Sequence, residues 1–155
     1  DENYSPIAGA FRQYELLYVL GDERDLVRLR ADLSETDRVY LFRVSAPPEI
    51  VRAIFLDYLK SCAALRAEPA WYHSLTSNCS TLIRKHVNAA HPDAPWDWRI
   101  LANGHLDERL YEQGHLDQSL PLPVLKSRSL INPAARRTGD SPDFSDRIRE
   151  NLPGF

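Results

Sequence analysis

The stretch from Trp71 to His86 constrains the fold more than any other part of the chain, because it marks the start of a helix. Aromatic and polar residues come first, and an apolar repeat at helical spacing follows them. The polar residues include three types that commonly cap helices, namely Thr76, Ser77 and Asn78. The apolar repeat consists of Leu82, Ile83, Val87 and Ala90. The pattern therefore predicts a helix whose first residue is Cys79.

Cys79 is the candidate nucleophile at this helix start. The first turn of a helix carries unpaired backbone N–H groups and the positive end of the helix dipole, which both favour a thiolate over a thiol. A thiolate can attack a carbonyl carbon, and the backbone N–H groups of Cys79 and Ser80 can hold the resulting oxyanion. Asn78 either caps the helix or offers its amide to that oxyanion. The alternative for Cys79 is a core position, because it faces the same side as Leu82 and Ile83.

A nucleophilic cysteine needs a base nearby to accept its proton, and the chain has five histidines. His73 lies just before the capping residues and can fold back, which makes it the best candidate within the chain. The alternative for His73 is a surface position or packing against aromatic rings. His86 lies two turns along the predicted helix, about 10 Å from Cys79 by helical rise, which is too far for direct proton transfer.

Composition indicates one ordinary domain, with 155 residues of which 43% are hydrophobic and 26% are charged. The formal net charge of -3 argues against a nucleic-acid partner. No cofactor-binding loop and no metal-ligand spacing occurs, so we expect neither a cofactor nor a metal. The sequence leaves open whether Cys62 and Cys79 form a disulfide, although Cys62 falls on an apolar helical stripe that favours the core.

The chain begins at Asp1 and contains no methionine, no signal peptide and no long apolar run. We therefore expect a processed product or an excised part of a longer protein, with functional parts encoded upstream.

Segments that favour strands come early in the chain, and segments that favour helices come late. The predicted strands are residues 14–20 and 25–30, which we expect to pair as a β-hairpin, and residues 38–44. The predicted helices are a long one that starts near Pro48 and ends before Pro69, the cysteine helix up to Pro92, and shorter ones at residues 96–103, 106–113 and 141–151. This order predicts an α+β fold in which a small antiparallel sheet packs against helices.

Charged residues gather on the predicted hairpin: Glu15, Glu23, Arg24, Arg28 and Arg30. One interpretation is a solvated or salt-bridged face. The other is that Glu15 and Arg24 line or brace a cleft, together with Tyr72 and Ser80 on either side of the cysteine turn.

Several segments, spread over most of the chain, resemble a single bacterial family. They are Phe11 to Leu16, Gly21 to Asp25, Trp71 to Ser80, Asp97 to Arg99 with Asn103 and Gly104, and Asp143 to Ser145 with Arg147 to Arg149. The family is an uncharacterised envelope family that shares a domain with the N-terminal periplasmic part of the bacterial lipoprotein intramolecular transacylase. Its most recognisable mark is an Asn-Cys pair followed by a hydroxyl residue, here Asn78, Cys79 and Ser80.

The resemblance implies a circularly permuted papain-like thiol fold, a periplasmic or envelope location, and acyl-transfer chemistry with Cys79 as the nucleophile. It also implies a partner histidine on a strand upstream of Asp1, so that the 155 residues would be the C-terminal portion of a longer papain-like domain lacking its N-terminal strands. In that case His73 would have to substitute as the base. The expected partner is an acyl or peptide-like substrate of the envelope, and upstream segments would bring the chain near the membrane.

Three possibilities therefore remain open. The first is a cysteine-dependent acyltransferase or amide/ester hydrolase. The second is a non-catalytic binding or structural domain in which Cys79 is buried. The third, between these two, is an inactive fragment of a real enzyme.

Overall fold

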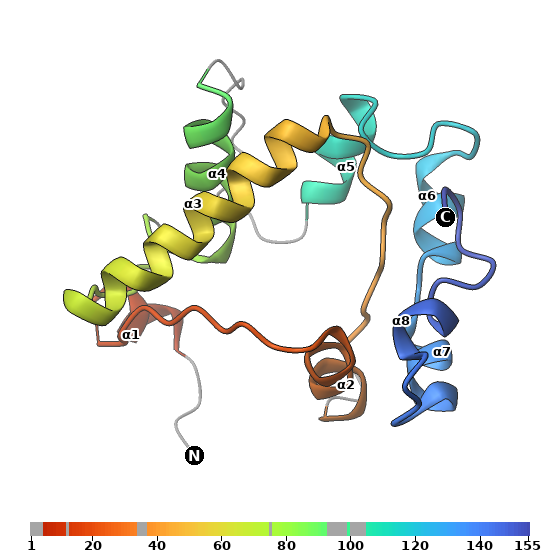
Figure 1. Cartoon of the computed structure of the whole chain (residues 1–155), viewed down its shortest axis with the longest axis horizontal. Helices are drawn as coiled ribbons and strands as arrows, with labels where there is room; N and C mark the ends of the chain where they lie inside the picture. The colour runs from red at the N-terminus through yellow and green to blue at the C-terminus, as the bar shows by residue number, and fades with distance from the viewer. Residues whose placement is uncertain (1–4, 12, 34–36, 75, 93–98, 100–104) are drawn as a thin grey trace. The chain divides into compact units, whose positions relative to one another are not determined.

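The structure, a computed structural model, describes residues 5–11, 13–33, 37–74, 76–92, 99 and 105–155. Across these residues it contains eight α-helices and no β-strand, with three isolated β-bridges (Figure 1). The helices are α1 (Pro6–Ala10), α2 (Glu23–Leu33), α3 (Pro48–Ala67), α4 (Cys79–Ala90), α5 (Leu106–Glu112), α6 (Leu122–Arg128), α7 (Asn132–Thr138) and α8 (Phe144–Arg147).

The chain divides into two compact units, and each unit is built from two separate stretches of sequence. The first unit comprises Asp1–Val19 and Ala46–Leu106. The second unit comprises Leu20–Ser45 and Asp107–Phe155. The candidate nucleophile belongs to the first unit, and the main apolar core belongs to the second.

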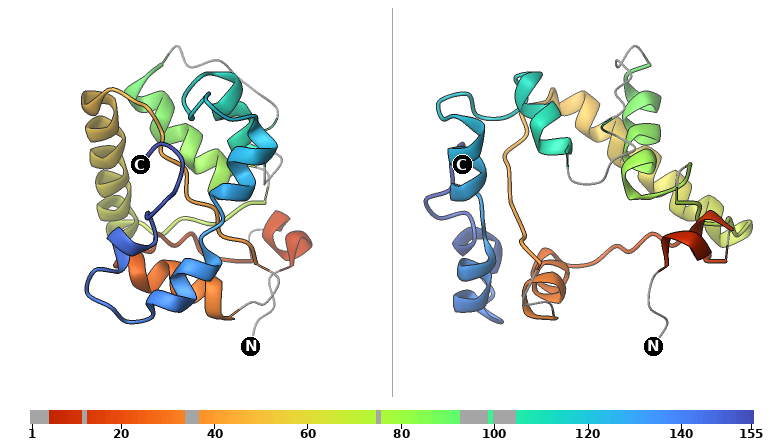
Figure 2. Two further views of the ribbon diagram at one scale, coloured as in Figure 1. Left: turned by 90° about the vertical axis from the view of Figure 1, so that its right-hand side faces the viewer. Right: turned by 180° about the vertical axis from the view of Figure 1, so that it is seen from behind.

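The first unit is organised around the pair of helices α3 and α4, which pack against each other and can be followed in yellow and green in Figure 2. Helix α3 starts with a proline in its first turn, where no intrahelical donor is lost, and it ends at Ala67, one residue short of the Glu68–Pro69 pair. The segment at residues 13–18 runs extended beside the chain that follows α3. Two hydrogen bonds hold it there, from the Leu16 N–H to the Ala70 carbonyl and from the Tyr72 N–H to the Tyr14 carbonyl, both 2.8 Å long.

The second unit contains a cluster of buried apolar side chains contributed by α2, α7 and α8. Its members are Ala31, Ile131, Ala135, Phe144 and Ile148. Helix α2 brings Ala31 to the cluster and packs Val27, one turn earlier, against it. Burial of these side chains from three short helices is the main apolar stabilisation that the described part of this unit shows.

The prediction of an antiparallel sheet, and with it the α+β and papain-like architecture, is wrong. Residues 25–30 lie inside helix α2, and residues 38–44 are extended with a single bridge, from Tyr40 to Leu130. The alternation at Val27 and Leu29 suggested a strand, but Val27 and Ala31 share one helical face and Leu29 is 53% exposed. Residues 14–20 have only the bridge from Glu15 to Trp71.

Three of the predicted helices are confirmed. Helices α3, α4 and α5 begin and end close to the predicted positions. The helix predicted over residues 96–103 falls outside the described part of the chain, except for Arg99. The last predicted helix is shorter than expected, because only Phe144–Arg147 is helical.

A bidentate ion pair joins α2 to the C-terminal part of the second unit. The Arg149 guanidinium donates to both carboxylate oxygens of Glu23, at 2.8 and 2.6 Å. These hydrogen bonds hold the pKa of Glu23 below its ordinary value, against the opposing effect of partial burial, and raise the pKa of Arg149. The interpretation of these charged residues as a salt-bridged face therefore holds for Glu23.

Acid is expected to remove the stabilisation that the Glu23 charge provides. Its folded-state pKa lies below the ordinary value of 4.5, so the contribution is complete above that value and is lost as the pH falls through the folded-state pKa. Urea unfolding of the wild type and of Glu23→Gln, from about pH 6 to about pH 3, should show a stability difference that shrinks with acid. A difference that stays constant over this range would contradict the assignment.

Truncation of the core aromatic should destabilise the second unit. Phe144 is 2% exposed, and Phe144→Ala should cost about 3–5 kcal/mol through lost burial and a residual cavity. The measurement is hydrogen exchange of the α7 and α8 amides, which should accelerate. Phe55→Ala is the matched control, because Phe55 is 56% exposed and belongs to the other unit. Equal effects of the two substitutions on these amides would refute the proposed core.

Candidate functional site

The start of α4 is fixed by a reciprocal pair of side-chain hydrogen bonds between Asn78 and Thr81. The Thr81 N–H donates to Asn78 Oδ1 at 2.8 Å, and the Asn78 N–H donates to Thr81 Oγ1 at 2.9 Å. The Asn78 side-chain amide also donates to the Ser74 carbonyl at 2.7 Å. Asn78 is 2% exposed, and both ends of its amide bond backbone groups. The capping interpretation of Asn78 is therefore confirmed.

Cys79 is the first residue of α4, as the sequence predicts, and its side chain is exposed. Its sulfur lies 3.9 Å from the Ser80 hydroxyl oxygen. The alternative of a buried core position for Cys79 is therefore wrong. The thiol is presented to solvent at a helix start.

The turn that precedes α4 holds His73. Its Nδ1 atom accepts a hydrogen bond from the Thr76 N–H at 3.3 Å, and its carbonyl accepts one from the Ser77 N–H at 2.9 Å. The turn packs closely on α1, because a Cβ atom at Gly9 would come within 2.4 Å of the Ser74 hydroxyl and 3.1 Å of the Tyr72 ring. A larger residue at Gly9 would therefore force the side chain of Ser74 or Tyr72 to shift.

The remaining predicted site residues are divided between the two units. Glu15 lies on the extended segment and forms its bridge with Trp71, next to Tyr72 in the chain. Tyr72, His73, Asn78, Cys79 and Ser80 follow one another along a single turn and helix start. Arg24 belongs to the second unit, where its guanidinium bonds Asp25 at 3.1 Å and its N–H bonds Asp22 at 2.9 Å. The solvated, ion-paired interpretation fits Arg24.

A buried histidine cluster in the first unit was missed by the sequence analysis. His86 on α4 is fully buried, and its Nδ1 lies 2.7 Å from Asp57 Oδ2 on α3. Its Nε2 lies 2.7 Å from the Tyr18 hydroxyl on the extended segment. The Tyr58 ring stacks obliquely on the imidazole, with centroids 3.8 Å apart. The three side chains Tyr18, His86 and Asp57 form what we call the Tyr–His–Asp chain.

Two hydrogen bonds join the members of the Tyr–His–Asp chain. His86 Nδ1 is paired with the Asp57 carboxyl group, and His86 Nε2 is paired with the Tyr18 hydroxyl. Burial raises the pKa of Tyr18, as do the nearby Cys62 and Asp57, while the Ser61 hydroxyl opposes the rise. Burial also raises the pKa of Tyr58. Both phenols therefore stay protonated at neutral pH.

A weak signal in the sequence could have located His86. It lies four residues after Leu82 and one before Val87, so it belongs to the apolar stripe of its own helix. Asp57 likewise lies between Ile54 and Tyr58 on the inner side of α3. A polar residue on each of two facing apolar stripes indicates a buried pair.

The described residues contain no group of three or more metal-ligand side chains that could hold an ion. Within the same described part, no helix combines the length and the apolar character that crossing a membrane requires.

Removal of the cap is expected to loosen the helix start that carries Cys79. Asn78→Ala loses the acceptor for the Thr81 N–H and should cost about 1–2 kcal/mol, measured by urea unfolding or by hydrogen exchange in the first turns of α4. Lys85→Ala is the matched control, because Lys85 is exposed on the same helix and its removal should change the free energy of unfolding by no more than about 0.5 kcal/mol. Equal destabilisation by both substitutions would show that the cap is not the stabilising contact.

Comparison with family models gives one match. A model described as the Lnb N-terminal periplasmic domain matches residues 1–104 of the chain. Comparisons with curated proteins and with solved structures give no match. The matched span includes the capped helix start and all members of the Tyr–His–Asp chain.

Proposed function

Because the chain belongs to the family of Lnb N-terminal periplasmic domains, we propose that it performs thiol-dependent acyl transfer, or amide or ester hydrolysis, with Cys79 as the nucleophile. Membership of this family places the chain in the periplasm or cell envelope. The observation that carries the proposal is the exposed thiol of Cys79 at the first position of a helix whose start is locked by Asn78 and Thr81.

The chemistry begins when the Cys79 sulfur attacks the carbonyl carbon of an acyl or peptide-like envelope substrate. The carbonyl π electrons move to oxygen, and N–H groups in the first turn of α4 stabilise the resulting charge. When the tetrahedral intermediate collapses, the leaving alcohol or amine takes a proton and departs, and a thioester with Cys79 remains. Water or a second alcohol or amine then attacks the thioester and regenerates the thiol.

His73 is the proposed base for the first proton transfer. It lies on the turn immediately before the cap. Its Nδ1 lone pair accepts from the Thr76 N–H at 3.3 Å, so to take the proton of Cys79 this nitrogen must exchange that hydrogen bond for one from the thiol. His86 is not used in this role, because its two ring nitrogens bond Asp57 and Tyr18 inside the first unit. Tyr72, Ser80 and Glu15 are proposed to line the approach to Cys79.

The test is covalent capture of an acyl group from p-nitrophenyl acetate, mapped to single cysteines by peptide mass spectrometry. Cys79 should form an acetyl thioester at least about tenfold faster in the native chain than in the urea-unfolded chain, because the helix start activates it. Cys62→Ala should leave this reaction intact, and Cys79→Ala should abolish it. His73→Gln should slow it about 100-fold if His73 is the base.

Two results would overturn the proposal. One is equal acylation of Cys79 in the native and unfolded chains, which would mean that the fold does not activate the thiol. The other is native-state acylation confined to Cys62. A normal rate in the His73→Gln variant would remove His73 from the mechanism and leave Cys79 in place.

A further inference from the structure

The extended segment at residues 13–18 has one edge that pairs with the chain after α3 and a second edge on the opposite side. The two hydrogen bonds of the paired edge use the Leu16 N–H and the Tyr14 carbonyl. Backbone groups of successive residues in a strand point to opposite edges, so the N–H and C=O groups of Glu15 and Leu17 point away from that pairing. We call these four groups the free edge.

Within the described part of the chain, no hydrogen bond uses the groups of the free edge. An unpaired strand edge is a template for another strand, and proteins commonly protect such edges with charged side chains or proline. Glu15 is the single charged residue of the extended segment, and the segment contains no proline. Its sequence therefore offers little protection against the addition of a further strand.

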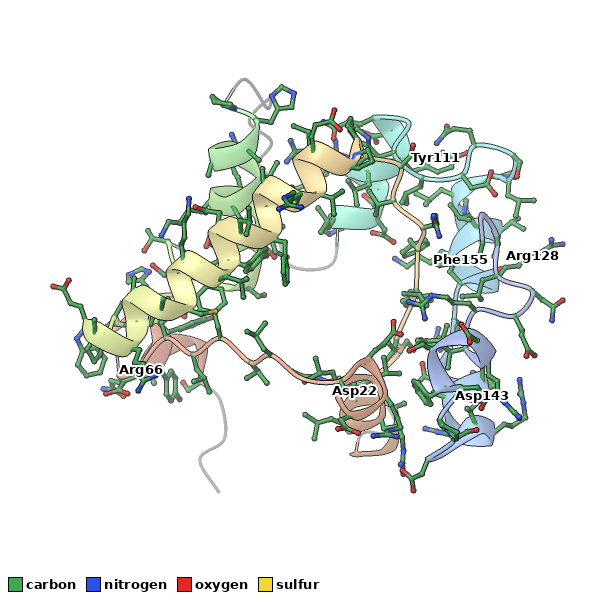
Figure 3. All side chains as sticks on the ribbon, in the orientation of Figure 1. Asp22, Arg66, Tyr111, Arg128, Asp143 and Phe155 are labelled. Atoms are coloured by element: carbon green, nitrogen blue, oxygen red, sulfur yellow. The ribbon has the colours of Figure 1, made fainter. Side chains whose placement is uncertain are left out.

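Side chains along the extended segment alternate between exposed and half-buried, as in a strand with one covered face. Figure 3 shows side chains on both sides of this segment, which follows α1 in the chain. Leu17 is 79% exposed, and Val19, two residues further on, is 64% exposed. Trp71, which forms the bridge with Glu15, is 54% exposed. Because residues opposite each other in a sheet share a face, these side chains form one exposed face that is mainly apolar.

We propose that the free edge is a docking site for an extended polypeptide segment, which adds as an antiparallel strand and packs apolar side chains on Leu17, Val19 and Trp71. The partner is a polypeptide because donors and acceptors that repeat at strand spacing match those of another backbone. The backbone hydrogen bonds supply affinity, and the exposed apolar face selects similar side chains on the partner. The exposed carboxylate of Glu15 favours a basic residue among them.

The test uses the peptide acetyl-Lys-Thr-Val-Thr-Val-Thr-Lys-amide and two isomers of equal mass and charge. One isomer is N-methylated at both valines, and the other is N-methylated at the first two threonines. When the valines pack on the exposed apolar face, their N–H groups point to the free edge and the threonine N–H groups point away from it. The threonine isomer should therefore bind like the unmodified peptide, and the valine isomer at least about tenfold more weakly, through the loss of backbone hydrogen bonds.

Binding is measured by ¹H–¹⁵N NMR titration of the full chain. The amides of Glu15 and Leu17 should show saturable shifts and slower hydrogen exchange, whereas the Leu16 amide, which already bonds the Ala70 carbonyl, should exchange at nearly its former rate. Equal affinity for the two isomers would indicate apolar contact without strand addition and would overturn the proposal, as would the absence of saturable shifts at these amides.

A titration of the chain without peptide tests the other possible occupant of the edge. Shifts of the Glu15 and Leu17 amides that depend on protein concentration alone would mean that two copies of the chain pair through this edge. That result would overturn the assignment of the edge to a separate partner segment.

Variants of two exposed side chains test the edge from the side of the protein. Leu17→Lys should weaken binding of the unmodified peptide about fivefold, because a lysine on an edge strand disfavours strand addition and repels the lysines of the peptide. Phe11→Lys is the matched control, because Phe11 is 73% exposed and lies outside the extended segment, and it should leave the affinity nearly unchanged. Equal weakening by both substitutions would indicate a general charge effect and would overturn the proposal. The Cys79→Ala variant should bind the peptide normally, so failure of the acyl-transfer proposal leaves this one standing.

Discussion

The burial of one imidazole determines much of the arrangement of the first unit. His86 brings a side chain of α4 into contact with side chains of α3 and of the extended segment, through hydrogen bonds that are 2.7 Å long on both sides of the ring. A buried polar ring without partners would cost several kcal/mol, whereas a satisfied one favours the single arrangement that supplies both partners. The helix pair and the extended segment are thus held in register by a polar contact.

This contact and the cap at Asn78 act on the same helix, two turns apart. The cap fixes where α4 begins, and His86 fixes which side of the helix faces α3. Residues seven apart share one side of a helix, so Cys79 lies on the same side as His86, and its thiol is exposed because it stands at the helix start.

Local signals predicted helices α3, α4 and α5 well and the sheet badly. The capping residues and the proline at the start of α3 act within a few residues, so they can be read directly from sequence. The segment from Asp25 to Arg30 has both a period-two and a helical pattern, and packing of Val27 and Ala31 against α7 decides between them. Helical spacing relates His86 only to Cys79 on its own helix, and it excludes His86 as the base for that thiol without revealing its buried contacts. Its partners Asp57 and Tyr18 lie 29 and 68 residues away, beyond the reach of any local pattern.

The two units differ in what they bury, and this difference bears on function. In the second unit the described core is apolar, with Phe144, Ile131 and Ile148 at its centre. In the described part of the first unit, the fully buried side chains are those of Asn78 and His86, and α3 buries none of its residues completely. Burying a polar group costs free energy unless all of its hydrogen bonds are made. A unit whose fully buried side chains are polar therefore gains precise positioning of its elements more than it gains free energy of unfolding. Such positioning is what a nucleophile at a helix start requires.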